Sequence, residues 1–417
     1  MSHPLLSFIP PGLMFRYSPY TVLPQTKALQ MSLRPARLDS VDILRGIAMI
    51  VMALDHTRDF FHIARFDPLD LTQTNTFLFL TRWVTHHCAP TFVFLAGTGA
   101  FLSGTRGKTP AELSRFLFTR GLWLVFLEFT AVRFGWLFNF DYSLTVGQVI
   151  WAIGWSMVAL AGLIRLPRWG MAAIAFGMIL FHNAFDGMDP ATFGSFAWLW
   201  QILHVQSAIM FDGGKVFIAM YPLIPWIGVM AAGYLFGSVL QKDEAVRRKL
   251  LYRIGLGLIA GFIILRGINI YGDPHPWHAQ TSLMFTVLSF IDTHKYPPSL
   301  LYLMMTLGPA ITVLPLFERW KGKLADAVAV YGRVPLFYYV LHICLIHILA
   351  VGAAWLTGKG VGFLFSNDLP GMWANDYGFS LGVVYLVWAG VILLLYLPCR
   401  WFAGVKRRRN DAWLSYL

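Results

Sequence analysis

The first apolar stretch of the chain carries ionisable side chains that an ordinary membrane-spanning helix lacks. Residues 41–61 are long enough to cross a bilayer, and they contain Arg45 near one end and His56 with Asp59 near the other. An ionisable side chain costs about 2.5–3.5 kcal/mol at a bilayer centre, so such residues mark function by default. The step from Arg45 to His56 makes about three helical turns, which puts both on one face about 16 Å apart. This geometry predicts chemistry conducted across a membrane.

His56 has the sequence surroundings of a general base. Asp59 lies three residues further on and shares its helix face, whereas the adjacent Asp55 points about 100° away. We therefore predict that Asp59 orients His56, and that Asp55 meets Arg82 or Arg266 across the bundle. A histidine with a carboxylate partner in a low-dielectric site is suited to act as a base near neutral pH. The alternative is that the two arginines only neutralise the aspartates as structural ion pairs.

The composition is that of an integral membrane protein. Hydrophobic residues make up 57% of the 417 residues and charged residues only 13%, against about 25% charged in soluble proteins. The net charge of +12 comes from basic residues in short gaps between apolar runs, not from a patch, which argues against nucleic-acid binding. The three cysteines lie in or beside apolar runs and predict neither a disulfide framework nor a zinc site.

Apolar windows of about 20 residues predict an all-α bundle of ten membrane spans. The spans lie near residues 41–61, 77–103, 116–136, 146–165, 168–186, 216–240, 250–271, 298–317, 327–355 and 380–402. Every second gap is rich in Lys and Arg, while the alternate gaps are poor in both. The positive-inside rule then puts both termini in the cytoplasm.

The sequence predicts a single membrane domain over residues 34–405. Residues 1–33 are expected to be an N-terminal extension, disordered or upstream of the natural start, and residues 406–417 a basic cytoplasmic tail. The outward gaps at 187–215, 272–297 and 356–379 are long and rich in aromatic residues, which predicts an ordered cover over an outward-facing cavity.

With this topology, polar residues of five spans converge at one depth in the outer half of the membrane. Arg82 and His86 are four residues apart and share a helix face. Later spans bring further members to that depth, namely Arg266, Asn269, Lys295 and His342. Such convergence indicates a site rather than scattered buried groups.

Arg45 and Arg333 lie instead in the cytoplasmic half of their spans, where either can meet a phosphate group of a ligand. The spacing of His56, Asp59 and His62 also suits a metal, but six residues turn a helix too far for all three to converge. No metal is therefore expected.

The first apolar stretch and the residues before it match a known pattern. RLDSVDILRGIAMIVMALDH (37–56) resembles the first span of the membrane-bound acyltransferase superfamily, in which a histidine follows an Arg–Gly pair as His56 follows Arg45 and Gly46. TRWVTHHCAPTFVFLAGTGAFL (81–102) is similar to the second span of bacterial members of the heparan-α-glucosaminide N-acetyltransferase catalytic-domain family. YGRVPLFYYVLHI (331–343) fits the same branch, and the resemblance covers nearly all of residues 34–417.

The resemblance implies ten or eleven spans in a bacterial inner membrane and transfer of an acetyl group from cytoplasmic acetyl-CoA to an envelope carbohydrate outside. It makes His56 the catalytic base and puts Arg45 on the donor path. Arg82, Arg266 or Lys295 would stabilise the oxyanion. The chain departs from lysosomal members, which have asparagine in place of His56 and a later His-x-x-Trp-Asn-Gly stretch that this chain lacks, so glucosamine N-acetylation becomes doubtful.

A proton-coupled transporter or channel is the alternative function, because intramembrane Asp, His and Arg relays also mark those proteins. Neither an inverted repeat nor a pair of broken helices is visible in the sequence, which favours the enzyme. The expected partners are the lipid bilayer and a carbohydrate acceptor, with no nucleic acid, and a homo-oligomer is compatible with the sequence.

Overall fold

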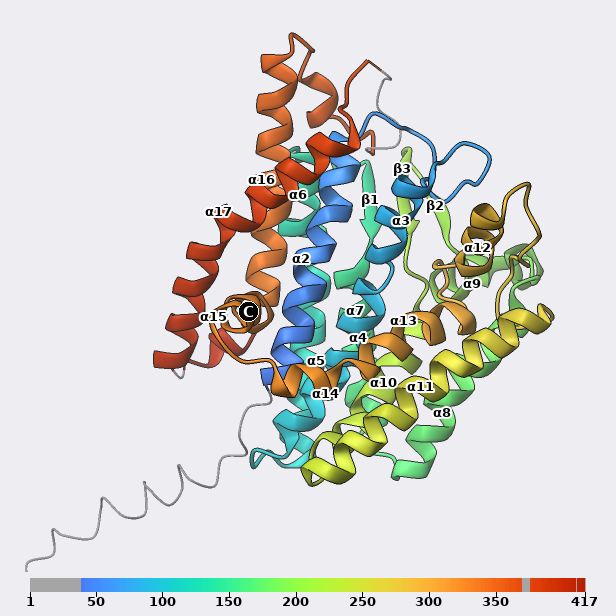
Figure 1. Ribbon diagram of the computed structural model, residues 1–417, viewed down its shortest axis with the longest axis vertical. Coiled ribbons are helices and arrows are strands. Elements are labelled where there is room, and N and C mark those ends of the chain that lie inside the picture. Colours follow the sequence, from blue (N-terminus) through green and yellow to red (C-terminus); the bar gives the residue numbers. More distant parts are fainter. Residues whose placement is uncertain (1–38, 370–375, 410, 417) are drawn as a thin grey trace, which may run out of the picture. The chain divides into compact units, whose positions relative to one another are not determined.

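The computed structural model describes residues 39–369, 376–409 and 411–416, most of which are helical (Figure 1). The α-helices are α2 (Asp39–Phe61), α3 (Thr76–Thr85), α4 (Cys88–Gly104), α5 (Pro110–Leu127), α6 (Arg133–Leu137), α7 (Val149–Leu163), α8 (Arg168–Phe181), α9 (Ala197–His204), α10 (Leu223–Leu240), α11 (Glu244–Ile268), α12 (Leu283–Ile291), α13 (Leu300–Thr312), α14 (Leu314–Arg319), α15 (Lys323–Arg333), α16 (Pro335–Leu356) and α17 (Leu381–Arg408). Between and after them lie a π-helical turn, η1 (Glu128–Val132), and the 3₁₀ turns η2 (His182–Phe185), η3 (Pro190–Phe196), η4 (Gly362–Phe365) and η6 (Ala412–Ser415).

Within the described residues, five helical segments are long and apolar enough to cross a membrane: α10, α11, α13 with α14, α16 and α17. The segment from α8 to α9, bent by 117°, adds a sixth if it is one span. Helix α2 has the length of a span, but it contains six charged residues. It contacts α3, α4 and α14 to α17, so protein surrounds most of its length (Figure 1). The count of ten spans stays a prediction.

Two of the predicted spans are each divided into two helices. The span predicted at 77–103 breaks between α3 and α4, at His86 and His87. The span predicted at 327–355 breaks at Val334, because the following Pro335 disfavours helical geometry in the residue before it. Figure 1 shows α15 nearly end-on while α16 runs lengthwise. Arg333 therefore ends a separate helix, and the expectation of one continuous span was wrong.

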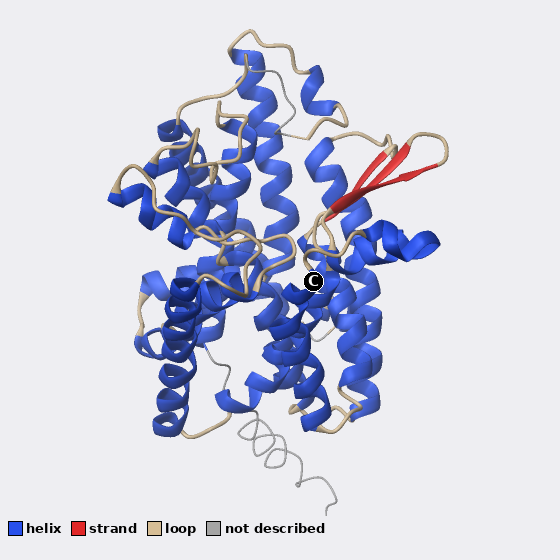
Figure 2. Cartoon of the chain, turned by 90° about the vertical axis from the view of Figure 1, so that its right-hand side faces the viewer, coloured by secondary structure: helices blue, strands red, loops and turns tan. Residues whose placement is uncertain are grey.

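A small sheet departs from the all-α prediction. It contains β1 (Leu144–Gly147), β2 (Ser207–Phe211) and β3 (Lys215–Ala219), with β3 in the middle, parallel to β1 and antiparallel to β2 (Figure 2). Gly213 and Gly214 turn the β2–β3 hairpin with φ values of 79° and 74°, which glycine adopts without strain. The span predicted at 216–240 thus begins as a strand, and its helix starts only at Leu223.

Glycines let α2 pack directly against α15. A Cβ atom on Gly46 would lie 2.1 Å from the carbonyl oxygen of Val328, and one on Gly332 would lie 1.9 Å from that of Asp42. Both distances are far below van der Waals contact, so only glycine allows the two backbones this approach. The contact fixes the end of α2 that carries Arg45 beside the end of α15 that carries Arg333.

The long gaps predicted as a cover contain regular structure. Residues 187–215 include η3, α9 and β2, and residues 272–297 include α12. In the gap at 356–379, residues 370–375 lie outside the described residues, as does the predicted extension at 1–33. The predicted basic tail begins inside α17, which continues to Arg408.

Candidate functional site

Two histidines from distant helices form the centre of the site. The Nδ1 atom of His56, on α2, lies 2.8 Å from the Nε2 atom of His342, on α16. The Nδ1 atom of His342 lies 3.0 Å from the carbonyl oxygen of Tyr338, one turn earlier in the same helix. His342 is fully buried, whereas His56 keeps partial exposure.

The Tyr338 carbonyl determines the tautomers of the pair. A carbonyl oxygen only accepts, so Nδ1 of a neutral His342 carries the proton and its Nε2 carries the lone pair. That lone pair accepts from Nδ1–H of His56. The remaining ring nitrogen of His56, Nε2, is then left with a lone pair, as a general base requires.

Aromatic rings enclose the His56 imidazole. The Trp136 ring lies edge-on with its centroid 5.0 Å away, and the Tyr339 ring is 6.1 Å away at nearly a right angle. Trp136 belongs to α6, so a third helix contributes to the wall around the base. These apolar faces limit the access of water to the histidine pair and leave few directions from which a reactant can approach.

A charged cluster follows His56 along α2 and corrects one prediction. Asp59 accepts a hydrogen bond of 2.6 Å from Arg58 and is not the partner of His56, because His342 takes that place. Asp55 pairs with Arg58 at 3.0 Å and with Arg82 of α3. The predicted contact between Asp55 and Arg82 across the bundle is therefore confirmed, and the orienting role predicted for Asp59 was wrong.

Lys295 and His86 also belong to this region. Lys295 is buried, with its ammonium group 5.0 Å from the centre of the Tyr296 ring, and it interacts electrostatically with Asp55 and His56. His86 follows the last residue of α3, and its backbone carbonyl accepts a hydrogen bond of 2.7 Å from the Tyr302 hydroxyl. The structure thus brings together residues predicted from four separate spans.

Two cavities lie toward opposite ends of α2, and neither is lined by His56 or His342. The first, of about 380 Å³, has mostly apolar walls that include Tyr339, and every charged residue in its lining is basic: Arg45, Lys108, Arg120 and Lys406. The second, of about 280 Å³, is polar, and its ionisable lining residues are Arg58, Asp59, His62, Arg65, Asp67 and Arg82. His56 lies on α2 between the residues that line one cavity and those that line the other.

The two arginines predicted on the cytoplasmic half meet at the start of α2. Arg45 donates to the carbonyl oxygen of Gly332 at 3.1 Å and pairs with Asp42 at 3.3 Å. Arg333 pairs with Asp39 at 3.3 Å and lies 3.7 Å from Asp42. The sequence predicts both arginines as contacts for a phosphate group. Arg45 lines the basic cavity and Arg333 does not, so only Arg45 keeps that predicted role.

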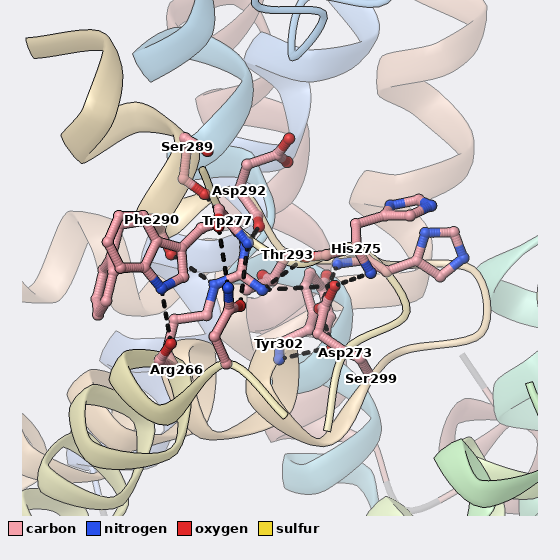
Figure 3. A network of polar contacts seen from close by, with 12 residues as sticks. Arg266, Asp273, His275, Trp277, Ser289, Phe290, Asp292, Thr293, Ser299 and Tyr302 are labelled. Atoms are coloured by element: carbon pink, nitrogen blue, oxygen red, sulfur yellow. Dashed lines mark hydrogen bonds and ion pairs between the residues drawn. The ribbon is translucent and has the colours of Figure 1, made fainter. Parts of the chain in front are cut away.

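Arg266 and Asn269 hold a loop and line neither of these two cavities. The guanidinium of Arg266 donates to the backbone carbonyls of His275, Ser289, Phe290 and Asp292 (Figure 3). Asn269 ends α11 in the left-handed conformation, and its amide exchanges two hydrogen bonds with the Trp277 backbone. The predicted binding role of both residues has no support in these contacts, because their polar groups serve the loop that follows α11.

Sequence reasoning missed several polar residues within the third predicted span. Arg120 lines the basic cavity, while buried Glu128 accepts a 2.8 Å hydrogen bond from the Trp151 backbone at the start of α7. Arg133 donates to the backbone carbonyls of Asn139, before β1, and of Leu144, the first residue of β1. Ionisable residues inside a membrane span mark function by default, as they do at 41–61. The same rule, applied to the span at 116–136, identifies these three residues as candidates.

A family model of known proteins matches the chain. The family model described as "Heparan-alpha-glucosaminide N-acetyltransferase, catalytic" matches residues 37–270, which is more than half of the chain and includes α2, α3 and their charged cluster. No curated protein matches the chain. His342 and Lys295 lie beyond the matched region. With its several apolar helices, the chain is a multi-pass membrane protein that belongs to the heparan-α-glucosaminide N-acetyltransferase catalytic-domain family of acetyltransferases.

Proposed function

We propose that the protein moves an acetyl group from cytoplasmic acetyl-CoA to a hydroxyl or amine of a carbohydrate on the other side of a bacterial inner membrane. One observation carries the proposal: a basic cavity and a polar cavity lie at opposite ends of α2, with the His56–His342 pair between them. A donor and an acceptor can then approach one base from opposite sides.

The basic cavity suits the donor. Coenzyme A combines several phosphate charges with a long, weakly polar arm that ends in the thioester. Arg45, Lys108, Arg120 and Lys406 offer positive charge to the phosphates, and the apolar wall offers contact to the arm. Tyr339 lines this cavity and also contacts His56, so it marks where the thioester would arrive. Arg333 is engaged by Asp39 and Asp42 and supports the helix ends instead.

The chemistry follows from the free nitrogen of His56. Nε2 removes the acceptor proton as the acceptor oxygen or nitrogen attacks the thioester carbonyl carbon. The carbon–sulfur bond then breaks, the acetyl group stays on the acceptor, and the proton on His56 passes to the departing thiolate. His342 keeps the ring in the required tautomer. Lys295 is the cation best placed to stabilise the oxyanion, because Arg82 is already paired with Asp55.

The orientation in the membrane belongs to the same proposal. With both termini in the cytoplasm, the end of α2 that carries Arg45 faces acetyl-CoA, and the end that carries Asp59 faces outward. The polar cavity then receives the acceptor. Its mixture of arginine and aspartate side chains suits the hydroxyl groups of a sugar.

Binding of coenzyme A to the purified, detergent-solubilised protein tests the donor side. We expect saturable thermal stabilisation by CoA, and about tenfold weaker binding for Arg120→Ala, which removes a cation from the cavity. Arg253→Ala is the matched control, because Arg253 is an exposed arginine of α11 outside the cavity. The proposal fails if millimolar CoA leaves the melting temperature unchanged, which is the result that a transporter or channel predicts.

A further inference from the structure

A second cluster of histidine and aspartate lies apart from the His56 site, at the bend between α8 and α9. His182 follows the last residue of α8, Asp186 follows η2, and His204 is the last residue of α9. The 117° bend of this segment brings the three together. One potential ligand atom from each residue lies within 4.8 Å of the others, and Nε2 of His204 is 3.7 Å from Oδ1 of Asp186.

The buried imidazole of His182 lacks hydrogen-bond partners. Its side chain is only 2% exposed, yet neither ring nitrogen forms a hydrogen bond of normal geometry, although the Pro298 carbonyl lies near the ring. Buried polar groups in folded proteins are nearly always satisfied, and each exception needs an explanation. A bound cation would supply the partner that the protein does not.

We infer that His182, Asp186 and His204 bind a zinc ion. Two imidazoles and one carboxylate, with a fourth position left for water, are a donor set that zinc prefers. Ligand atoms around tetrahedral zinc lie about 3.3–3.5 Å apart, so the 3.7 Å between His204 and Asp186 is already close to the bound geometry. Binding exchanges the 2.9 Å hydrogen bond between His204 Nε2 and the His182 carbonyl for a metal–nitrogen bond.

Neighbouring residues orient the ligands. Asn183 donates to Oδ2 of Asp186 at 2.8 Å, which leaves Oδ1 toward His204. The Trp200 ring stacks on the His204 ring with the centroids 4.9 Å apart. Such support of the first ligands is typical of metal sites.

The ion would hold two parts of the protein together. Asn183, beside His182, accepts a hydrogen bond of 2.9 Å from the backbone of Leu300 at the start of α13. The segment before α13 carries Lys295. Zinc would therefore fix the α8–α9 bend itself, to which the hydrogen bond of Asn183 ties the start of α13. The inference does not depend on the proposed acetyl transfer, since it concerns metal binding alone.

Zinc titration of the whole purified protein, made metal-free and carrying an affinity tag without histidine, tests the site. We expect one zinc ion per chain, and a rise in melting temperature of about 2 °C or more when zinc is added. Asp186→Asn should weaken zinc binding at least tenfold, and His182→Ala should abolish it. His278→Ala, which removes an exposed histidine outside the cluster, should bind zinc as the wild type does.

The inference is overturned if the wild-type protein binds no zinc, or if Asp186→Asn binds it with unchanged affinity. Asp186→Asn decides the matter should His182→Ala fail to fold, because the asparagine keeps the shape of a partly exposed side chain. Magnesium and calcium, which prefer oxygen ligands, should not compete with zinc at equal concentration.

Discussion

The base at the centre of the proposed mechanism depends on a residue 286 positions away in the chain. Without His342, Nδ1 of His56 would lose its acceptor, and its proton could move to Nε2, the atom that must receive the proton of the acceptor. Burial strengthens this dependence, because His342 is fully buried and little water can replace it. His342 is thus a positioning residue, acting through His56 rather than on the substrate.

We predict that His342→Ala lowers kcat for acetyl transfer by about 10²-fold, the lower end of what a general base contributes. The KM for acetyl-CoA should change little, because His342 does not line the basic cavity. His342→Gln should recover part of the rate, since its amide oxygen can accept from His56 Nδ1. Steady-state kinetics of the three proteins give the answer, and equal rates for the alanine variant and wild type would contradict the role.

Two aspartates of α2 should differ sharply in their effect on stability. Asp55 neutralises both Arg58 and Arg82 in buried surroundings, so Asp55→Asn should lose about 3–5 kcal/mol by leaving those charges uncompensated. Asp59 has a more exposed side chain, and its ion pair is with Arg58, so Asp59→Asn should lose about 1 kcal/mol or less. Thermal unfolding in detergent distinguishes the two, and similar losses would show that the cluster has been misassigned.

The sequence predicted His56 as a candidate base but not the residue that pairs with it. His56, Asp55 and Arg82 follow from helical spacing and from the cost of charge in a membrane. Asp59 looked like the better partner for His56 because only neighbours on the same helix can be judged from spacing. The adjacent Arg58 takes that carboxylate, and the true partner comes from α16.

At the scale of elements, packing between backbones positions the donor end of α2. Gly46, which the sequence suggested only as part of a recurring Arg–Gly pair, touches the backbone of α15. Arg333 of α15 then pairs with Asp39 and Asp42 of α2 and so bridges the two helices that glycine has already brought together, while the pair of Arg45 with Asp42 lies within α2.

Gly46→Ala should destabilise the protein by at least about 1–3 kcal/mol, because the new methyl group would overlap the Val328 carbonyl. Gly257→Ala is the matched control within a helix: a Cβ atom there meets nothing within 4 Å, so stability should stay unchanged or rise by up to about 1 kcal/mol. Melting temperatures of both variants provide the comparison. If Gly46→Ala melts with the wild type, the close contact of α2 and α15 is wrong.

The loop network around Arg266 predicts a dependence of stability on pH. Burial, together with the carboxylates of Asp273 and Asp67, raises the pKa of Asp292 to about 7. The folded protein therefore favours the protonated acid, and this stabilisation fades as the pH rises from about 4, the ordinary pKa of an aspartate, through about 7, by up to about 1.4 kcal/mol per unit. Asp292→Asn should flatten the decline in melting temperature between pH 5 and pH 8. An equally steep decline in the variant would exclude Asp292 as its source.

The bounds of α2 agree with the predicted span to within two residues, whereas α11 begins six residues before its predicted span and α17 ends six residues after its own. Other predicted spans contain a break that the hydropathy pattern does not show: Pro335 divides α15 from α16, and the Asp–Gly–Gly turn at 212–214 makes a hairpin. The loop role of Arg266 could not be read from the sequence, because its acceptors are backbone carbonyls of residues up to 26 positions away.

At the scale of the whole molecule, α2 connects two environments of different character. Its Arg45 end lines a cavity whose charged residues are all basic, and its Asp59 end lines a polar cavity with both signs of charge. The chain belongs to an acetyltransferase family, and the proposed function assigns the basic cavity to the donor and the polar cavity to the acceptor. The central claim is that His56 performs the transfer between them.

Acetyl transfer by the purified protein tests this role of His56. The protein in nanodiscs is given radiolabelled acetyl-CoA and envelope glycan from a strain that lacks the gene, and label in the glycan is measured over time. We expect transfer by the wild type and by His278→Ala, and a loss of at least about 10²-fold for correctly folded His56→Ala. Transfer by His56→Ala at the wild-type rate would contradict this role.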